Sequence, residues 1–265
     1  MPAKSRNCLP GSFRADFFGV SSAICLNSGL KFLSYKEAGK KMVSELDVSK
    51  VKFVLFDWDN TLAESKTPLL FAIRQVIAEK NLPSWEALQS VRDHELSFKA
   101  NFKNFFNGRA DEVYERYAEV YLQNVKRLIR TFPKVPEVLR FLRGRGIKMM
   151  IMTNKDRRLL EYELPLLFEA DFFERIVCGC EAPFDKPHKE QVFYTLRGYL
   201  QPKEITRSNV WVVGDSPQDS NAALASGALP IRIGNAIWEE FETRCDQVLY
   251  LKDFADFYGR LQEQN

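Results

Sequence analysis

Short apolar runs alternate along this chain with segments that have helical periodicity. Five such runs are present, and they comprise residues 51–56, 147–152, 176–178, 210–213 and 229–233. Runs of this length that are rich in Val, Ile, Leu and Phe are typical of strands buried on both faces of a parallel sheet. Parallel strands need long crossovers, and residues 135–145 and 220–226 have the spacing of such helices. The pattern predicts a doubly wound α/β fold with a parallel sheet, whose ligands bind at the carboxyl ends of the strands.

An insertion is expected between the first two strands, because the intervening stretch of about 70 residues is far longer than one crossover helix. We expect a helical cap at residues 66–132, inserted after the first strand, and a core domain of residues 51–65 and 133–265. Thr67 and Pro68 have the pattern of a helix N-cap followed by a first-turn proline.

The cap carries aromatic residues at helical spacing over residues 98–106, and these are expected to form its core rather than to contact substrate. Basic side chains lie among them at Lys99, Lys103 and Arg109. They either bind an anionic metabolite or form a solvated face, and the pattern leaves both interpretations open.

Residues 1–50 are expected to form an N-terminal extension that is partly disordered or peripheral. Lys4, Arg6 and Arg14 precede an apolar stretch, as in a signal or transit peptide, although Asp16 interrupts the pattern. The other interpretation is a poorly ordered segment, with Met42 at the functional start of the folded unit.

Net charge narrows the choice of partner. The chain carries a formal net charge of +3, and residues 1–50 account for more than all of it, with eight Lys and Arg against four acids. The remainder is nearly neutral, which argues against a nucleic-acid partner because binding to the phosphate backbone needs clustered cations. No apolar run approaches the ~20 residues that cross a bilayer, so no membrane partner is expected.

The five cysteines are scattered and odd in number, so they do not describe a disulfide framework. A reducing compartment is the better prediction, and we therefore expect a cytoplasmic location. Cys178 and Cys180 lie two apart in a strand-like run and are expected to be buried on one sheet face rather than to bind a metal.

The first apolar run ends in two acids, Asp57 and Asp59, at the point where the predicted strand gives way to a loop. Asp57 can attack phosphorus to form an aspartyl phosphate, while Asp59 donates a proton to the leaving oxygen and later withdraws one from water. A divalent cation would offset the repulsion of the two acids, and oxygen ligands favour Mg²⁺. The alternative is that both acids only cap the following turn.

Polar residues follow the later predicted strands in the same way. Thr153 and Asn154 offer a hydroxyl and backbone N–H groups to phosphate oxygens, and Lys186 could neutralise the nucleophile and the transferring phosphoryl group. Asp215 could bind the cation directly, and Asp219 could bind it through water or hold Asp215 in place. Each residue alone also fits a helix cap or a solvated charge, so the argument depends on their agreement at successive strand ends.

These segments together resemble the motifs of the haloacid dehalogenase superfamily, in order FVLFDWDNTL, IMTNK, Lys186 and VVGDSPQD, and the likeness extends from residue 51 to about residue 251. The resemblance implies a Rossmann-like core with an inserted helical cap, as in phosphoglycolate-phosphatase-like members. It also implies a Mg²⁺-dependent hydrolase of phosphoric monoesters that acts on a small phosphorylated metabolite.

The resemblance implies a role for each motif residue. Asp57 would be the nucleophile and a metal ligand, and Asp59 would be the general acid and base, with its backbone carbonyl also on the metal. Asp215 would complete the metal ligands of the protein, with Asp219 behind them. The residues that would hold the phosphoryl oxygens are Thr153, Asn154 and Lys186.

Three departures from the pattern are mild. Trp58 and Asn60 stand where phenylalanine and glycine are frequent, and His188 follows Pro187 where many relatives have another small or proline residue. They leave the expected chemistry intact, but they weaken any transfer of substrate identity from the family to this chain.

Several alternatives remain at this point. A dehalogenase would lack a second acid at the position of Asp59, so the presence of Asp59 favours phosphate chemistry. A sugar phosphomutase uses the same residues but has to keep water out of the site, and the sequence leaves this alternative open. A response-regulator receiver also combines paired acids, a threonine and a lysine, but there the acids do not follow the first strand and no cap is inserted. An inactive relative that serves as an interaction module is disfavoured because all motif acids are present. The oligomeric state stays open.

Overall fold

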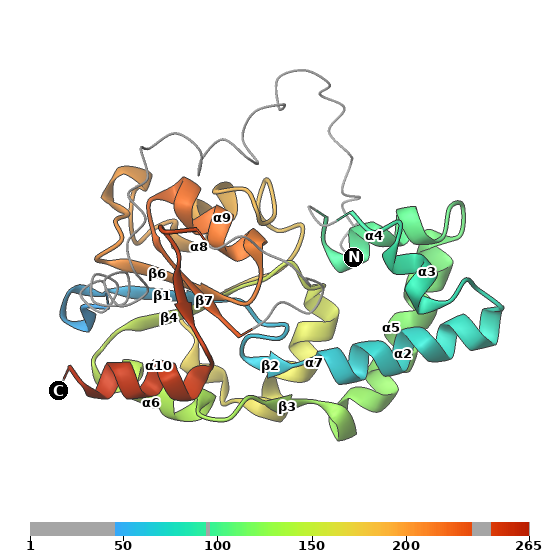
Figure 1. Cartoon of the computed structure of the whole chain (residues 1–265), viewed down its shortest axis with the longest axis horizontal. Coiled ribbons are helices and arrows are strands. Elements are labelled where there is room, and N and C mark those ends of the chain that lie inside the picture. The colour runs from blue at the N-terminus through green and yellow to red at the C-terminus, as the bar shows by residue number, and fades with distance from the viewer. Residues whose placement is uncertain (1–45, 94–95, 235–244, 265) are drawn as a thin grey trace, which may run out of the picture. The chain divides into compact units, whose positions relative to one another are not determined.

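The computed structural model describes residues 46–93, 96–234 and 245–264, and it contains a six-stranded, fully parallel sheet (Figure 1). The strands lie in the order β5-β4-β1-β6-β7-β8. The chain builds outward from β1 in both directions, which confirms the doubly wound fold. The strand bounds are β1 Phe53–Phe56, β4 Lys148–Met152, β5 Arg175–Val177, β6 Val210–Gly214, β7 Leu229–Ile233 and β8 Leu249–Leu251.

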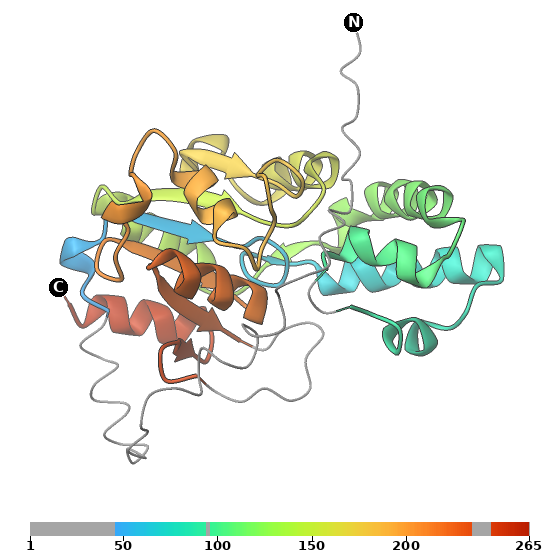
Figure 2. The ribbon, with the colours of Figure 1, turned by 90° about the horizontal axis from the view of Figure 1, so that it is seen from above.

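Helices cover both faces of this sheet (Figures 1 and 2). On one face, α8 (Glu190–Leu196) packs beside α9 (Pro217–Ser226), and on the other α6 (Val135–Gly144) packs beside α10 (Phe254–Gln262). Apolar side chains of β1, β4 and β6 pack in one cluster with α8 and α9. Within the described ranges there are also three 3₁₀ turns, namely η1 (Val48–Lys50), η2 (Ala170–Phe172) and η3 (Pro202–Glu204).

The expected insertion leaves the core through a short antiparallel pair, in which β2 (Ala63–Glu64) lies beside β3 (Arg130–Thr131). Four helices lie between these two strands, and we call them the cap helices (Figure 2). They are α2 (Lys66–Lys80), α3 (Trp85–Gln89), α4 (Phe98–Phe105) and α5 (Ala110–Leu128). The last of them also packs against α7 (Arg157–Leu167) of the core.

The aromatic residues of α4 form the centre of the cap, as predicted. Phe102 is buried and meets the rings of Phe98, Phe106, Tyr114 and Tyr117 at centroid distances of 5.1–5.6 Å. Edge-on and tilted ring pairs of this kind stabilise a core beyond the burial of apolar area. The division of the chain into core and cap domains at residues 65 and 133 stays a prediction.

Two local predictions are wrong. The first cap helix begins at Lys66 with Ser65 as its N-cap, not at Thr67. Strand β5 ends at Val177, so only Cys178 is buried, whereas Cys180 lies in an exposed turn with a φ of 66°.

Two expectations concern segments that bear on location. The N-terminal extension lies outside the described residues up to position 45, so neither interpretation of it is tested. Among the described residues, no helix combines the length and the apolar character needed to cross a membrane.

Candidate active site

The first predicted motif forms a tight loop at the carboxyl end of β1. Asp57 leaves the strand with its N–H still bonded to the carbonyl of Val213. The chain then turns so sharply that three successive N–H groups, those of residues 61–63, donate to the carbonyl of Trp58. Asn60 adopts the left-handed conformation at φ 58°, which asparagine and glycine tolerate best. This explains why Asn60 can stand where relatives of this motif often have glycine.

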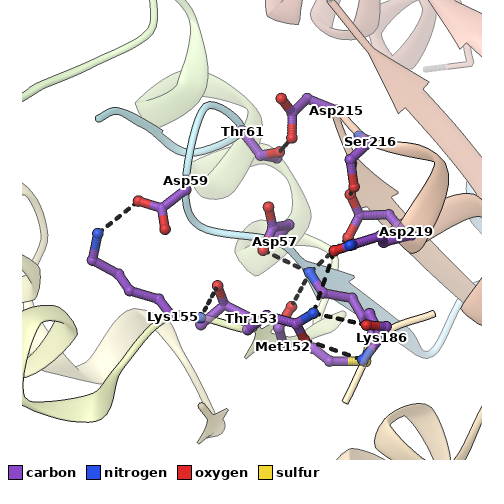
Figure 3. Close-up of polar contacts among 12 residues, drawn as sticks. Asp57, Asp59, Thr61, Met152, Thr153, Lys155, Lys186, Asp215, Ser216 and Asp219 are labelled. Atoms are coloured by element: carbon purple, nitrogen blue, oxygen red, sulfur yellow. Dashed lines mark hydrogen bonds and ion pairs between the residues drawn. The ribbon is translucent and has the colours of Figure 1, made fainter. Parts of the chain in front are cut away.

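Lys186 joins the two halves of the site, as Figure 3 shows. Its ammonium nitrogen lies 2.6 Å from Oδ1 of Asp57 and 2.6 Å from Oδ1 of Asp219, and it also donates to the carbonyl of Met152 at 2.9 Å. The lysine side chain is buried at 3% exposure, so these contacts are made away from bulk water. Residues 129 positions apart in the chain therefore form one charged centre.

The fourth motif supplies two more acids from the end of β6 and the start of α9. Asp215 accepts hydrogen bonds from Asn60 Nδ2 at 2.7 Å and from the Thr61 hydroxyl at 3.5 Å. Asp219 accepts from the backbone N–H and the hydroxyl of Ser216, at 3.1 and 2.7 Å, which closes a capping box on α9. The helix-capping interpretation is thus correct for Asp219, but the same carboxyl also reaches Lys186.

Only glycine fits at position 214, at the end of β6, because the Asp219 carboxyl packs against it. A Cβ placed there would lie 2.1 Å from Cγ of Asp219, a separation that real side chains do not adopt. The absence of a side chain at position 214 lets the Asp219 carboxyl pack directly against the end of the strand.

The carboxyls of Asp57, Asp215 and Asp219 form a concentrated negative site, because each offers an oxygen within 4.8 Å of the others. Burial, opposed by the charge of Lys186, raises the pKa of Asp57 to about 6. Burial and the neighbouring carboxylates of Asp57 and Asp219 raise the pKa of Asp215 well above its ordinary value. Buried acids held this close favour a compensating cation, and the all-oxygen donor set fits a hard divalent ion.

The second motif lies opposite, at the end of β4. The hydroxyl of Thr153 accepts from the N–H of Lys155 at 3.2 Å and lies in a turn, while the N-cap of α7 is Asp156, so Thr153 is not a helix cap. Asn154 binds the backbone of Lys186 with both ends of its amide, through Oδ1 at 3.1 Å and Nδ2 at 2.8 Å. The Asn154 side chain therefore positions Lys186, and a contact from Asn154 to a phosphoryl group would come from its backbone N–H.

Asp59 is set apart from the acidic cluster. Its Oδ1 lies 2.7 Å from the ammonium of Lys155, on the other side of the loop from Asp215 and Asp219 (Figure 3). Asp59 and Asp57 both line a cavity of about 120 Å³ together with Thr153, Lys186 and Asp215. The two acids of the first motif thus face one space but have different partners.

Cap residues line the same cavity. Phe98, Lys99, Tyr114 and Tyr117 contribute side chains from α4 and α5, so some rings of the cap core also face the site. Lys99 forms an ion pair with Asp156 of the core at 2.5 Å and lies over the Tyr114 ring. By contrast, Lys103 and Arg109 are exposed and do not line the cavity.

Some residues of the site were not singled out by sequence reasoning. Gln191 accepts from the N–H of Lys186 at 2.9 Å and donates to the carbonyl of Thr153 at 3.1 Å, so it joins two motif loops. Lys155 was part of the quoted second motif, and that adjacency was the available signal for it. Gln191 lies in α8, and Glu163, a partner of Lys155, lies in α7. In the sequence each is an ordinary polar residue of a helix that belongs to no motif, so nothing marked either one.

These features define a class of α/β hydrolases. They are a doubly wound sheet, an acid at the end of its first strand, a lysine opposite that acid, and a second acidic loop. This chain belongs to the haloacid dehalogenase-like hydrolase family, whose sequence profile matches residues 54–232.

The chain is similar along most of its length to proteins named phosphoglycolate phosphatase. It is 26% identical over 215 residues to the one from Haemophilus influenzae, a match that covers 72% of this chain and 94% of the relative. A solved structure of a predicted phosphoglycolate phosphatase from Haemophilus somnus has a TM-score of 0.66 and 21% identity, with 79% of this chain and 97% of that chain covered. CbbY from Rhodobacter sphaeroides, solved with phosphate, has a TM-score of 0.66 and 17% identity over 80% of this chain and 99% of that chain. The solved structures support the fold.

Proposed function

We propose that this protein is a Mg²⁺-dependent phosphatase that hydrolyses a small phosphorylated metabolite through an aspartyl phosphate on Asp57. The observation that carries the proposal is the position of Lys186, whose ammonium lies 2.6 Å from Asp57 and 2.6 Å from Asp219 in a buried acidic cluster. A cation so placed can stabilise both the attacking carboxylate and the charge of the transferring phosphoryl group.

The metal would be held by the carboxylates of Asp57 and Asp215 and by the backbone carbonyl of Asp59, with Asp219 fixed behind them by Lys186 and Ser216. When bound, the ion would neutralise these acids and polarise the phosphoryl oxygens. The Asp59 carboxyl is not part of the acidic cluster, which suits a residue that binds a metal through its carbonyl and keeps its side chain for proton transfer.

The residues then divide the reaction between them. An oxygen of Asp57 attacks phosphorus, the ester P–O bond breaks, and the leaving oxygen takes a proton from Asp59. Water next attacks the phosphorus of the aspartyl phosphate and loses a proton to Asp59, which releases inorganic phosphate and restores Asp57. Thr153 and the backbone at Asn154, together with Lys186, would hold the phosphoryl oxygens through both steps.

The substrate proposal rests on the relatives and on the size of the site. Proteins named phosphoglycolate phosphatase match this chain over 94% of their length in the example above, and the cavity of about 120 Å³ favours a metabolite of few atoms. We therefore take 2-phosphoglycolate as the first candidate substrate, followed by small sugar phosphates.

The test is release of inorganic phosphate from 2-phosphoglycolate, sugar phosphates, nucleotides and p-nitrophenyl phosphate, each with Mg²⁺ and with EDTA. We expect Mg²⁺-dependent release by wild type and none by Asp57→Asn, with beryllium fluoride as an inhibitor that occupies the phosphoryl position. Strict dependence on a sugar bisphosphate would favour a phosphomutase instead. Activity that survives in Asp57→Asn would remove Asp57 from the nucleophile role.

A further inference from the structure

The carboxyl of Asp59 is held by a buried network that the proposed reaction does not yet use. Lys155 lies 2.7 Å from Oδ1 of Asp59, and the lysine side chain is only 7% exposed against 29% for the aspartate. The contact therefore joins a buried cation to an acid that faces the cavity.

Lys155 is fixed in turn from its other side. Glu163 on α7, with a fully buried side chain, lies 3.0 Å from the same ammonium and accepts a hydrogen bond from the indole N–H of Trp58 at 2.5 Å. Tyr121 of the cap helix α5 closes the network, with its hydroxyl 3.5 Å from Lys155. Adjacent residues of the first motif, Trp58 and Asp59, are thus tied to the same buried Lys155–Glu163 pair.

Fold stability alone does not account for this arrangement. A buried ion pair is often no more stabilising than an apolar pair of similar volume, because both charges lose their hydration. Here burial raises the pKa of Glu163 even though Lys155 opposes it, so the glutamate carries a cost of desolvation. Trp58, which stands where phenylalanine is frequent, fits the same network. Its buried indole N–H needs a hydrogen-bond acceptor, which Glu163 provides, whereas a phenylalanine ring would need none.

We propose that Lys155 is a positioning residue for Asp59: it holds Oδ1 of the carboxyl so that the other oxygen carries the transferable proton toward the leaving group. Glu163, anchored by Trp58, fixes the ammonium in the position from which it does so. This inference rests on the proposed function, because Lys155 acts only through Asp59, which protonates the leaving oxygen in the first step and takes a proton from water in the second.

The test uses substrates that need proton donation to different degrees. p-Nitrophenyl phosphate and phenyl phosphate have similar shapes, but phenoxide is the more basic leaving group and depends more on a general acid. The value of kcat/KM reports the steps up to formation of the phosphoenzyme. General acids contribute about 10²–10⁴-fold, so Lys155→Met should lower kcat/KM roughly 10–100-fold for phenyl phosphate and less than about 3-fold for p-nitrophenyl phosphate.

Three variants make the outcome specific. Lys155→Arg keeps a cation and should recover most of the activity on phenyl phosphate. Lys148→Met is the matched control, because it removes an exposed lysine, paired with Glu174, at the opposite end of β4, and it should leave both substrates unaffected. In an Asp59→Asn background, Lys155→Met should cost little further, since the group that it positions is already lost.

Loss of a buried cation can also impair folding, so melting temperatures accompany the kinetics. If Lys155→Met does not fold, the double variant Lys155→Met/Glu163→Gln removes both charges and carries the same kinetic prediction. Equal losses on the two esters, a rise in KM alone, or a full further loss in the Asp59→Asn background would each overturn the positioning role. Absence of any Mg²⁺-dependent phosphatase activity in wild type would instead overturn the proposed function.

Discussion

Replacing Asp57 by asparagine should stabilise the metal-free protein at neutral pH while it abolishes turnover. Asp57 is buried beside the carboxyls of Asp215 and Asp219. Burial raises its pKa from 3.8 to about 6 even though Lys186 lies against it. The ionised side chain is therefore less favourable in the folded protein than in the unfolded chain.

The sign and size of the effect follow from this pKa. A carboxyl with a raised folded pKa contributes stability below its unfolded pKa, and that contribution is lost as the pH rises through the folded value. For Asp57 this window runs from pH 3.8 to about 6. Each pKa unit corresponds to about 1.4 kcal/mol, so well above pH 6 the free energy of unfolding is lower by about 3 kcal/mol than with a neutral side chain.

Thermal unfolding in EDTA, followed by circular dichroism from about pH 4 to about pH 7.5, measures this difference. At the upper end Asp57→Asn should melt about 6–12 °C above wild type, because 1 kcal/mol shifts the melting temperature of a domain of this size by about 2–4 °C. The difference should vanish toward pH 4. Excess Mg²⁺ should stabilise wild type and have less effect on the variant, since the metal loses a carboxylate ligand.

Asp171→Asn provides the matched control, because Asp171 pairs with Arg143 at 60% side-chain exposure, where its charge is well hydrated. It should change the melting temperature little at any pH. An Asp57→Asn protein that is less stable than wild type in EDTA at neutral pH, or a difference that persists unchanged at pH 4, would refute the reasoning.

Three further outcomes are expected. Gly214→Ala should lower the free energy of unfolding by about 1–3 kcal/mol and weaken Mg²⁺ binding, because the new Cβ displaces the Asp219 carboxyl. Urea denaturation measures the first effect and calorimetry the second. Gly144→Ala is the control, since a Cβ at position 144 meets nothing within 4 Å. Lys186→Met should lower the free energy of unfolding by about 3–5 kcal/mol in EDTA at neutral pH, because it leaves buried carboxylates without their cation. The loss should be smaller near pH 5, where the raised pKa of Asp57 lets that carboxyl become neutral, and urea denaturation at the two pH values checks this. Deletion of residues 1–41 should leave kcat for the best phosphoester unchanged, and loss of soluble expression would show that the segment is structural.

The sequence by itself determined the plan of the sheet and the order of the site residues. The apolar runs of β1, β4, β6 and β7 were recognisable because strands buried on both faces need nearly continuous apolar side chains. The polar residues that end these runs had to meet at one edge, since parallel strands bring their carboxyl ends together. The sequence analysis did not predict β8, a strand of three residues, Leu249–Leu251, at the edge of the sheet.

Only the tertiary structure decided how the charges of the site are paired. The acids of the first motif lie two residues apart, yet Asp57 pairs with Lys186 and Asp59 with Lys155, because the loop after β1 turns their side chains to different sides. Glu163 has the appearance of a surface residue on an amphipathic helix until α7 packs against the first motif and buries it. Such pairings depend on distances between residues 96 to 129 positions apart in the chain, and those distances are set by packing rather than by any local pattern.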